Sequence, residues 1–267
     1  LIIGQEGPTG TLIEGLRVAF GVEKTLTPEK NSAKVTVYNL SKDTRVATED
    51  DNVLAVLKAG YQTAQEILFV GNVVRSTSTR QGADIVTTLE LGDGSEAIDN
   101  TTIFESFGEG TPLNDIIGRL VRSFSVPVKE NSVQVDGQTT NGITLEGLAR
   151  DGLKILGDSF GFDFSVEDNE MLVLPRDSVT QEQAVVLNTG TGLVGIPEKV
   201  TGNVSKGDGD ATTGVKVKSL LNPSIRVGRQ INIESETVTG QYKVKKVKHT
   251  GDTRGSDWYS DVEADAL

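Results

Sequence analysis

The sequence predicts an α+β fold that is predominantly β, with two small antiparallel β-barrel-like domains flanking a mixed α+β insert. Short segments of alternating apolar and polar residues fill the first and last thirds of the chain, which is typical of half-buried strands. Two segments of the middle third instead carry apolar residues at helical spacing. We therefore predict a first β domain over 1–95, the insert over 96–183 and a second β domain over 184–267.

The clearest strand of the first domain has Ala33, Val35 and Val37 on one face. Gly71 lies inside another strand and predicts a bulge or a close approach between backbones. Ser41 is a suitable N-cap for a short helix. The elements expected in this domain are strands at 11–20, 32–38, 53–59, 67–74 and 84–91 and a helix at 42–49.

Two helices are expected in the insert. The first has Thr111 as N-cap and Pro112 at the first helical position. Its apolar stripe consists of Leu113, Ile116, Ile117, Leu120, Val121 and Phe124. The second covers 144–160 and ends before Gly161, a suitable C-cap. A hairpin is then expected from strands at 162–166 and 171–174, with a polar turn between them.

The last domain returns to short strands. In the strand at 241–249 the alternation slips at Lys245-Lys246, which predicts a β-bulge. The segment 201–213 has almost no apolar residues and is expected to form a mobile loop. The remaining strands are expected at 183–187, 214–221, 230–233 and 259–264.

The composition excludes several classes of protein. A formal charge of −12 argues against binding of nucleic acid or anionic membrane over the whole surface. The sequence has no cysteine, which rules out disulfides and thiolate metal sites. No apolar run approaches the ~18 residues that a membrane helix needs, so we expect no membrane insertion.

Tests for catalytic and metal sites give no candidate, and we expect no catalytic residue, no metal ligand and no cofactor. Gly157–Gly161 matches the G-x-S-x-G pattern around Ser159, but a nucleophile elbow follows a strand, whereas this segment ends a helix. His249 lacks a second histidine or an orienting partner, which favours a structural or surface role. Asp208 and Asp210 lack the further ligands of a calcium loop.

The one basic cluster of the sequence lies in the strand with the slipped alternation, and it has two interpretations. Lysines protect exposed edge strands from unwanted pairing. The same charges would also suit a contact with an acidic neighbouring subunit. The cluster consists of Lys243, Lys245, Lys246 and Lys248.

Four groups of segments together resemble the baseplate hub proteins of contractile phage tails, the family that includes the Mu-type hub. They are 31–41; 56–61 followed by 67–71; 189–197; and 217–223 with Gly228, 240–252 and Asp257-Trp258. The positions that carry the resemblance are Tyr38, Asn39, Leu40, Gly60, Tyr61, Gly71, Asn222, Pro223, Gly228, His249, Gly251 and Trp258.

This resemblance implies a structural protein of the virion baseplate, assembled in the host cytoplasm, and not an enzyme. It implies a homotrimer in which two similar barrel-like domains per subunit imitate six-fold symmetry. Such a ring would join the hexameric tail tube to the trimeric central spike, contact other baseplate proteins and let DNA pass without specific binding. We expect the acidic excess to face the lumen. The alternatives are the hub of a tailocin or related contractile injection machine, and a tail-associated hydrolase.

Overall fold

The computed structural model describes residues 1–5, 10–50, 52–61, 64–93, 95–129, 132, 135–201 and 213–267. The strands are β1 (Ile2–Gln5), β2 (Gly10–Leu12), β3 (Val18–Thr25), β4 (Ser32–Tyr38), β5 (Val53–Tyr61), β6 (Ala64–Gln81), β7 (Asp84–Gly92), β8 (Thr102–Phe107), β9 (Ile143–Leu148), β10 (Phe162–Glu167), β11 (Glu170–Pro175), β12 (Val185–Leu187), β13 (Leu193–Thr201), β14 (Thr213–Leu220), β15 (Gln230–Glu234), β16 (Thr239–Asp252) and β17 (Trp258–Ala266). The helices are α1 (Lys42–Ala47), α2 (Ser95–Asn100), α3 (Leu113–Ser123) and α4 (Ala149–Phe160). The predicted α+β class with a predominance of strands is confirmed.

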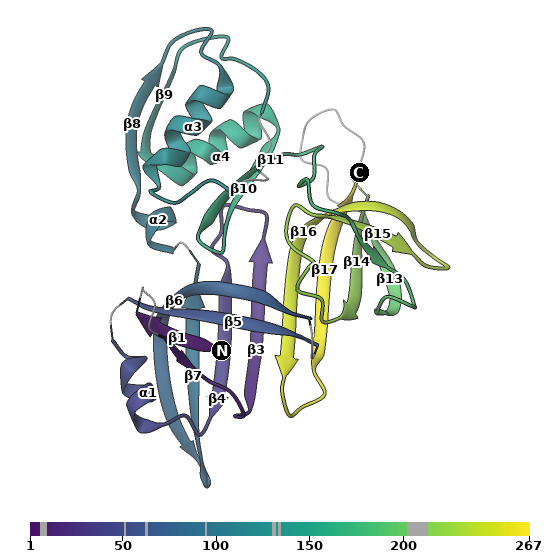
Figure 1. Ribbon diagram of the computed structural model, residues 1–267. Coiled ribbons are helices and arrows are strands. Elements are labelled where there is room, and N and C mark those ends of the chain that lie inside the picture. The colour runs from purple at the N-terminus through teal and green to yellow at the C-terminus, as the bar shows by residue number, and fades with distance from the viewer. Residues whose placement is uncertain are drawn as a thin grey trace.

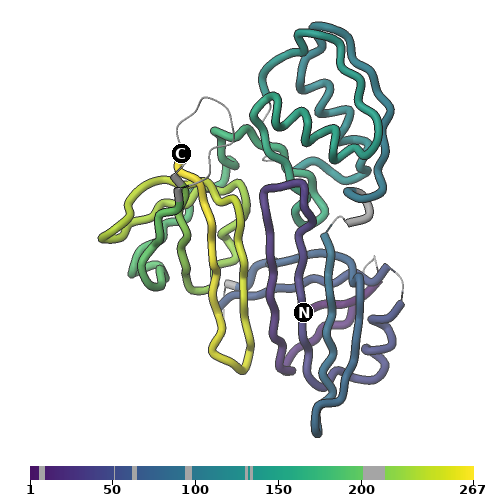
Figure 2. The backbone as a smooth tube through the Cα atoms, turned by 180° about the vertical axis from the view of Figure 1, so that it is seen from behind, coloured from purple at the N-terminus to yellow at the C-terminus, as the bar shows by residue number. Residues whose placement is uncertain are grey.

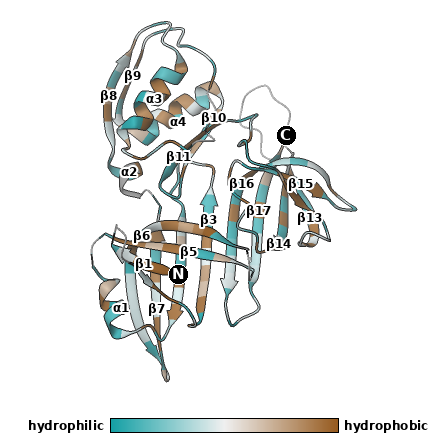
Figure 3. Ribbon diagram, viewed as in Figure 1, coloured by the Kyte–Doolittle hydropathy of each residue, from teal (hydrophilic) through white to brown (hydrophobic). Residues whose placement is uncertain are grey.

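One wide sheet joins the first and last thirds of the chain. Its pairing order is β13-β14-β17-β16-β3-β4-β7-β6-β5-β1-β2, and the two thirds meet where β3 pairs antiparallel with β16. Figures 1 and 2 show the strands of both thirds side by side in one row. Along β14, β16 and β17 hydrophobic and hydrophilic residues alternate, so that one face of the sheet is apolar and the other polar (Figure 3).

The same arrangement of strands occurs twice in this sheet. We call β3, β4, β6 and β7 the first unit and β13, β14, β16 and β17 the second unit. In space the strands of the first unit follow the order β6, β7, β4, β3, and those of the second unit the order β16, β17, β14, β13. When the strands of each unit are numbered by their order in the chain, both arrangements read third, fourth, second, first. The first strand of the first unit, β3, therefore pairs with the third strand of the second unit, β16.

In both units the third strand is long and belongs to two layers. The beginning of β6 pairs with β5 and its end pairs with β7, with a register shift between Val73 and Arg75. The beginning of β16 pairs with β15 and its end with β17, with a shift between Val244 and Lys246. This confirms the bulge predicted at Lys245-Lys246. As Figure 1 shows, β5 and the first part of β6 cross over the other strands of the first unit.

Each unit encloses its own apolar cluster between these layers. Buried residues of β3, β4, β5, β6 and β7 form the first cluster, and those of β14, β15, β16 and β17 form most of the other. Hydrogen bonding does not close either unit into a barrel, because the pairing path of the described strands runs open from β13 to β2. The barrel-like expectation thus holds for the layering and not for closure.

The insert folds around two helices. The stripe of α3 predicted from the sequence is buried, and it packs with α4, β10 and residues of the paired strands β8 and β9 in a third apolar cluster. The hairpin β10–β11 is the part of the insert nearest to the wide sheet (Figures 1 and 2). Within the described residues, no helix is long and apolar enough to cross a membrane.

Two local predictions for the insert are wrong, namely the single helix over 144–160 and the N-cap at Thr111, and the C-cap at Gly161 is confirmed. The segment 144–160 is not one helix, because 143–148 pairs with β8 as β9 and the helix begins at Ala149. The N-cap of α3 is Pro112, while the Thr111 hydroxyl donates to the Gly108 carbonyl at 2.7 Å. Gly161 does end α4, in the left-handed conformation with φ 74°. Positions 202–212, which include Asp208 and Asp210, lie outside the described residues.

Candidate functional site

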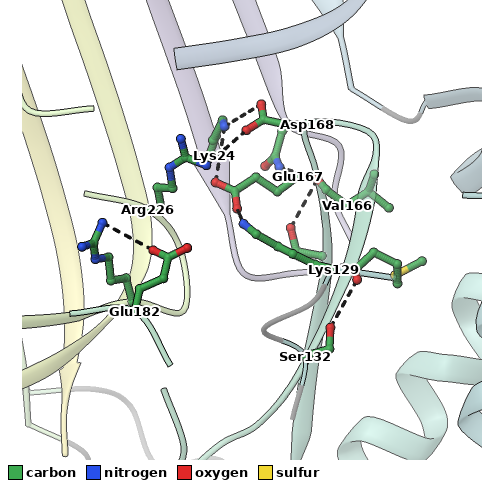
Figure 4. A network of polar contacts seen from close by, with 12 residues as sticks. Lys24, Lys129, Ser132, Val166, Glu167, Asp168, Glu182 and Arg226 are labelled. Atoms are coloured by element: carbon green, nitrogen blue, oxygen red, sulfur yellow. Dashed lines mark hydrogen bonds and ion pairs between the residues drawn. The ribbon is translucent and has the colours of Figure 1, made fainter. Parts of the chain in front are cut away.

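The turn of the β10–β11 hairpin inserts polar side chains where the insert meets both units (Figure 4). Asp168 and Asn169 have φ values of 55° and 65°, and Glu167 pairs with Glu170 on either side of them. Positive φ at both central residues is the property of a type I′ turn, which asparagine and aspartate tolerate. We call this turn and the residues that bind it the hairpin joint.

Glu167 is the buried centre of the hairpin joint. Its carboxylate lies 3.3 Å from Lys24 Nζ of β3, which is itself 3% exposed, and it also accepts a hydrogen bond from Lys129 Nζ. Burial alone would raise the pKa of Glu167. The ammonium groups of Lys24 and Lys129 outweigh that effect and lower the pKa to about 2. The folded chain therefore holds this carboxylate ionised between two lysines.

Asp168 connects the turn to both units. Its Oδ1 accepts hydrogen bonds from Lys24 Nζ at 2.9 Å and from the Val70 backbone N–H at 3.2 Å. Its Oδ2 lies 3.8 Å from Nη1 of Arg226, which precedes β15. One carboxylate thus contacts β3, β6 and a loop of the second unit.

Asp93 and Asn31 bind the backbone of the same hairpin. Asp93 accepts hydrogen bonds from the N–H groups of Asp168 (2.5 Å) and Asn169 (2.7 Å). Burial, together with the nearby Asp168 carboxylate, raises the pKa of Asp93 to about 7 despite these bonds. The Asn31 amide donates to the Val166 carbonyl at 2.6 Å. The arrangement satisfies buried polar groups and fixes the position of the insert.

The hairpin joint was not predicted from the sequence, although one signal was present. In β3 the apolar face contains Val18, Phe20 and Val22, and Lys24 continues that face. A lysine at a core position needs a buried partner. Its partners lie more than 140 residues away in the chain, and they are glutamate and aspartate residues that no local pattern distinguishes.

His249 has a structural role. The Asn222 N–H donates to Ser260 Oγ at 3.0 Å, and this hydroxyl lies 2.8 Å from His249 Nδ1. The ring also has a hydrogen bond with the backbone of Ile225. The hydroxyl therefore donates to Nδ1 and the other ring nitrogen donates to the Ile225 carbonyl. The ring is 2% exposed and links the segment from Asn222 to Ile225, which includes Pro223, to the sheet.

We expect His249 to make stability depend on pH below neutrality. Burial lowers its pKa to about 3, so the folded chain stays unprotonated at pH values where the unfolded chain, titrating near 6.5, takes up a proton. The contribution of neutral His249 is complete above pH 6.5 and is lost as pH falls toward 3, by about 2 kcal/mol at pH 5. Urea unfolding of the wild type and of a His249→Gln variant at pH 5 and 7 isolates this contribution, because Asp93, whose pKa is raised to about 7, acts with the opposite sign in both chains. The difference in unfolding free energy between the two chains should change by about 2 kcal/mol between the two pH values, and an unchanged difference would contradict the assignment.

The G-x-S-x-G segment does not form a nucleophile elbow. Ser159 lies in the last turn of α4, and its hydroxyl donates to the Ile155 carbonyl at 2.8 Å. Gly157 allows a close approach, since a Cβ there would lie 2.6 Å from the Phe162 carbonyl oxygen. The described residues also contain no group of three or more histidine, cysteine, aspartate or glutamate side chains that could hold a metal ion.

Several of the positions that carry the resemblance lie close together where β3 begins and β16 ends. A Cβ on Gly251 would lie 2.4 Å from the ring of Phe20, which packs edge to face against Trp258 at 5.6 Å between centroids. The guanidinium of Arg17 lies over the Tyr38 ring and binds Asp252 at 2.7 Å. Gly228 lies apart from this group: its φ is 76°, and its N–H donates to the carbonyl of Val244 in the first half of β16.

The other resemblance positions lie apart from these. Asn39 has φ 60°, and its amide donates to Asp84 at 2.8 Å, while Leu40 is buried. Tyr61, half exposed, follows Gly60 (φ 149°) at the end of β5. Gly71 confirms the predicted close approach, because a Cβ there would lie 2.5 Å from the Gly92 carbonyl oxygen.

The lysines of β16 have different surroundings. The edge-strand interpretation is wrong, because β16 pairs with β15, β17 and β3. Lys243 is 1% exposed and donates to the Pro175 carbonyl at 2.8 Å, so its ammonium serves a contact within the subunit. Lys245 binds Asp163 of β10 at 2.6 Å. Lys246 binds Glu23 at 2.5 Å and Lys248 is exposed, so for these two an inter-subunit contact stays a prediction.

The polar face of the wide sheet carries charges whose sign changes from strand to strand. Lys216 of β14 binds Glu263 of β17 at 3.0 Å, and Lys246 of β16 binds Glu23 of β3. The strands follow the order β6, β7, β4, β3, β16, β17, β14, β13. In that order their charged residues on this face are Arg75; Glu90; Lys34; Glu23; Lys246 and Lys248; Asp261 and Glu263; Lys216 and Lys218; and Glu198. Acidic and basic groups are nearly balanced on this face, in contrast to the chain as a whole. A shallow groove lies on it beside residues 194–196.

Solved structures with the same fold come from tails and secretion machinery. The 43 kDa tail protein of prophage MuSo2 from Shewanella oneidensis is 10% identical with a TM-score of 0.69, covering 98% of this chain and 97% of that one. The tail protein from Neisseria meningitidis MC58 is 6% identical with a TM-score of 0.62, covering 92% and 91%. The E. coli c3393 protein, a type VI secretion component described as similar to tail proteins gp27 and gp5 of bacteriophage T4, is 8% identical with a TM-score of 0.64, covering 99% and 76%.

No curated protein sequence matches the chain. A protein family does: the family described as baseplate hub gp41 matches residues 2–264. The match covers both units and the insert, and it confirms the resemblance stated from the sequence. It also agrees with the expectation of a structural protein, because the hub is not an enzyme. The chain belongs to the baseplate hub gp41 family of phage tail proteins.

Proposed function

We propose that three copies of the chain form a ring that joins a six-fold tail tube to a three-fold central spike in the baseplate. The observation that carries this proposal is the repeated strand order of the two units. Three copies with two similar units each place six similar surfaces around one axis. The ring then matches a hexamer on one side while its true symmetry remains three-fold on the other.

The position of the insert supports the same assembly. Each subunit has one insert and two units, so the inserts follow the three-fold symmetry alone. The hairpin joint fixes the insert at the boundary between the two units through Lys24, Asp168 and Arg226. We propose that the chain divides into a first unit at 1–95, the insert at 96–183 and a second unit at 184–267. Most residues of each apolar cluster belong to one of these three ranges.

We propose that the polar face of the units lines the lumen through which DNA passes. Backbone phosphates attract unpaired cations strongly, and this attraction makes DNA adhere. On this face most lysines have an acidic neighbour on the next strand. A wall of this kind is balanced rather than acidic, which refines the expectation that the acidic excess faces the lumen. The excess of −12 then resides mainly on other surfaces.

The partners of such a ring are the tail tube, the central spike and other baseplate proteins, in a virion assembled in the host cytoplasm. A hub of a related contractile injection machine is the second candidate, and it is favoured by the structural likeness to the E. coli secretion component. Both candidates use the same ring.

Light scattering of the purified chain tests the trimer. We expect a mass about three times 28.4 kDa at high protein concentration, with dissociation on dilution. Hydrolytic activity is expected to be absent from the same sample. A mass that stays at one chain at all concentrations, or a stable assembly of two or four chains, would contradict the proposed ring.

A further inference from the structure

We infer that Phe104 and Glu146, on the outer face of β8 and β9, bind an arginine side chain of another protein whose surface is basic. We call these two residues the arginine site. The site lies within a single insert, so the inference goes beyond the proposed ring and does not depend on it.

The outer face of β8 and β9 has no cover among the described residues. These two strands pair only with each other, and α3 and α4 lie on one side of them (Figure 1). On that inner side, Leu145 belongs to the apolar cluster of the insert and Ile103 packs against it. Phe104 points the other way and is 77% exposed, the largest fraction among the large apolar side chains of the described residues. Aromatic rings are enriched at protein interfaces, which makes this face a contact surface.

Glu146 shares this face with Phe104. The two residues are directly opposite each other in the antiparallel ladder, a position in which Cβ atoms lie about 5 Å apart. On one side the pair is flanked by the short side chains of Ser106 and Thr144, whose hydroxyl oxygens lie 3.0 Å apart. Ring and carboxylate therefore project together beyond these neighbours.

Elsewhere in the chain, an aromatic ring and a carboxylate share one cation. The guanidinium of Arg17 lies 4.6 Å from the centre of the Tyr38 ring and donates hydrogen bonds of 3.1 and 2.7 Å to the two oxygens of Asp252. The other cation–π contacts of the described residues also include a carboxylate: they are Lys24 with Phe69 and Asp168, and Lys218 with Tyr259 and Asp261. Phe104 and Glu146 provide the ring and the carboxylate without the cation.

The charge of the insert indicates the source of this cation. Residues 96–183 contain 16 acidic and 6 basic residues, a formal charge of −10 out of −12 for the whole chain. Five of the six basic side chains bind acidic residues of the insert itself, namely Arg119, Lys129, Arg150, Lys154 and Arg176. The insert therefore repels DNA, anionic membranes and the insert of another copy, and it attracts a basic protein surface.

Arginine suits the site better than lysine. Its planar guanidinium stacks on an aromatic ring and forms two parallel hydrogen bonds to a carboxylate at the same time, as Arg17 does. Lysine supplies one compact, strongly hydrated charge. At its own ring and carboxylate, Lys218 stays 3.8 Å from Asp261.

Titration of the purified chain with a short arginine peptide with blocked ends, followed by NMR, tests the arginine site. Phe104→Leu keeps an apolar side chain without a ring, and Glu146→Gln removes the charge, so each should weaken binding about threefold. The corresponding lysine peptide should also bind more weakly to the wild type. Asp115→Asn, at an exposed carboxylate of α3, is the matched control and should bind like the wild type. Equal losses from Glu146→Gln and Asp115→Asn would overturn the site, because the overall charge of the insert would then account for binding.

Crosslinking in the tail particle tests the partner. With a photoreactive phenylalanine analogue in place of Phe104, we expect a link to a segment of a different protein that contains arginine. The same analogue in place of Ile155, which is exposed on α4, is the control and should not link to that segment. No link from position 104, a link to a second copy of this chain, or a linked segment without arginine would overturn the inference and leave the proposed ring intact.

Discussion

Replacing Glu167 by glutamine is expected to lower the free energy of unfolding by about 3–5 kcal/mol, the usual effect of removing one member of a buried ion pair. The neutral amide leaves Lys129, which is 11% exposed, without the carboxylate that it contacts, and leaves the buried Lys24 with the Asp168 carboxylate alone. A buried ammonium that loses a carboxylate partner costs far more than the loss of an exposed ion pair. Urea unfolding at pH 7 measures the difference.

The pH dependence provides a second readout for Glu167. Its pKa is about 2 in the folded chain and near 4.5 as a free group, so its contribution is complete above pH 4.5 and is lost as pH falls toward 2. Glu170→Gln is the matched control, because Glu170 lies in the same hairpin, is partly exposed and is expected to change stability by less than about 0.5 kcal/mol. Equal effects of the two substitutions would contradict the role of the hairpin joint.

Gly71→Ala is expected to destabilise the chain by about 2–3 kcal/mol, through overpacking of the first unit. A Cβ at this position would lie 2.5 Å from the carbonyl oxygen and 2.9 Å from the carbonyl carbon of Gly92. Backbone atoms of a paired strand cannot move aside as a flexible side chain does. The added methyl group would therefore push β6 away from β7, where the register shift begins.

Gly21→Ala is the control for Gly71→Ala. Gly21 lies in β3 of the same unit, and a Cβ there would meet no atom within 4 Å. Because glycine weakens a strand interior relative to alanine by roughly 0.5–1 kcal/mol, this change should be neutral or slightly stabilising. Thermal unfolding of both variants distinguishes them. If Gly71→Ala were as stable as Gly21→Ala, the close approach would not be a constraint.

The sequence predicted those elements whose pattern is local. The alternation in 32–38, the stripe that begins at Leu113 and the slip at Lys245-Lys246 each correspond to an observed strand, helix or bulge. The strand β9 was missed because Leu145 and Leu148 continue a helical spacing into α4, although pairing with β8 decides its conformation. The strand β13 was missed because Gly195 and Pro197 interrupt its alternation.

The arrangement of the two units and the hairpin joint could not be predicted, because both depend on contacts between distant segments. The units share a strand order without a repeat in their residues, since a strand position constrains only the polarity of its side chains. The pairing of β3 with β16 joins residues more than 200 positions apart. The polarity pattern predicted a β structure for each outer third, whereas the similarity of the two thirds was expected only from the resemblance to hub proteins.

Electron cryomicroscopy of the tail particle, reconstructed without imposed symmetry, would show directly whether the ring exists. We expect three copies of the chain at the junction between tube and spike, with their six units around one axis and their inserts arranged with three-fold symmetry. Six copies at the junction, or three copies whose units do not surround one axis, would contradict the proposed ring.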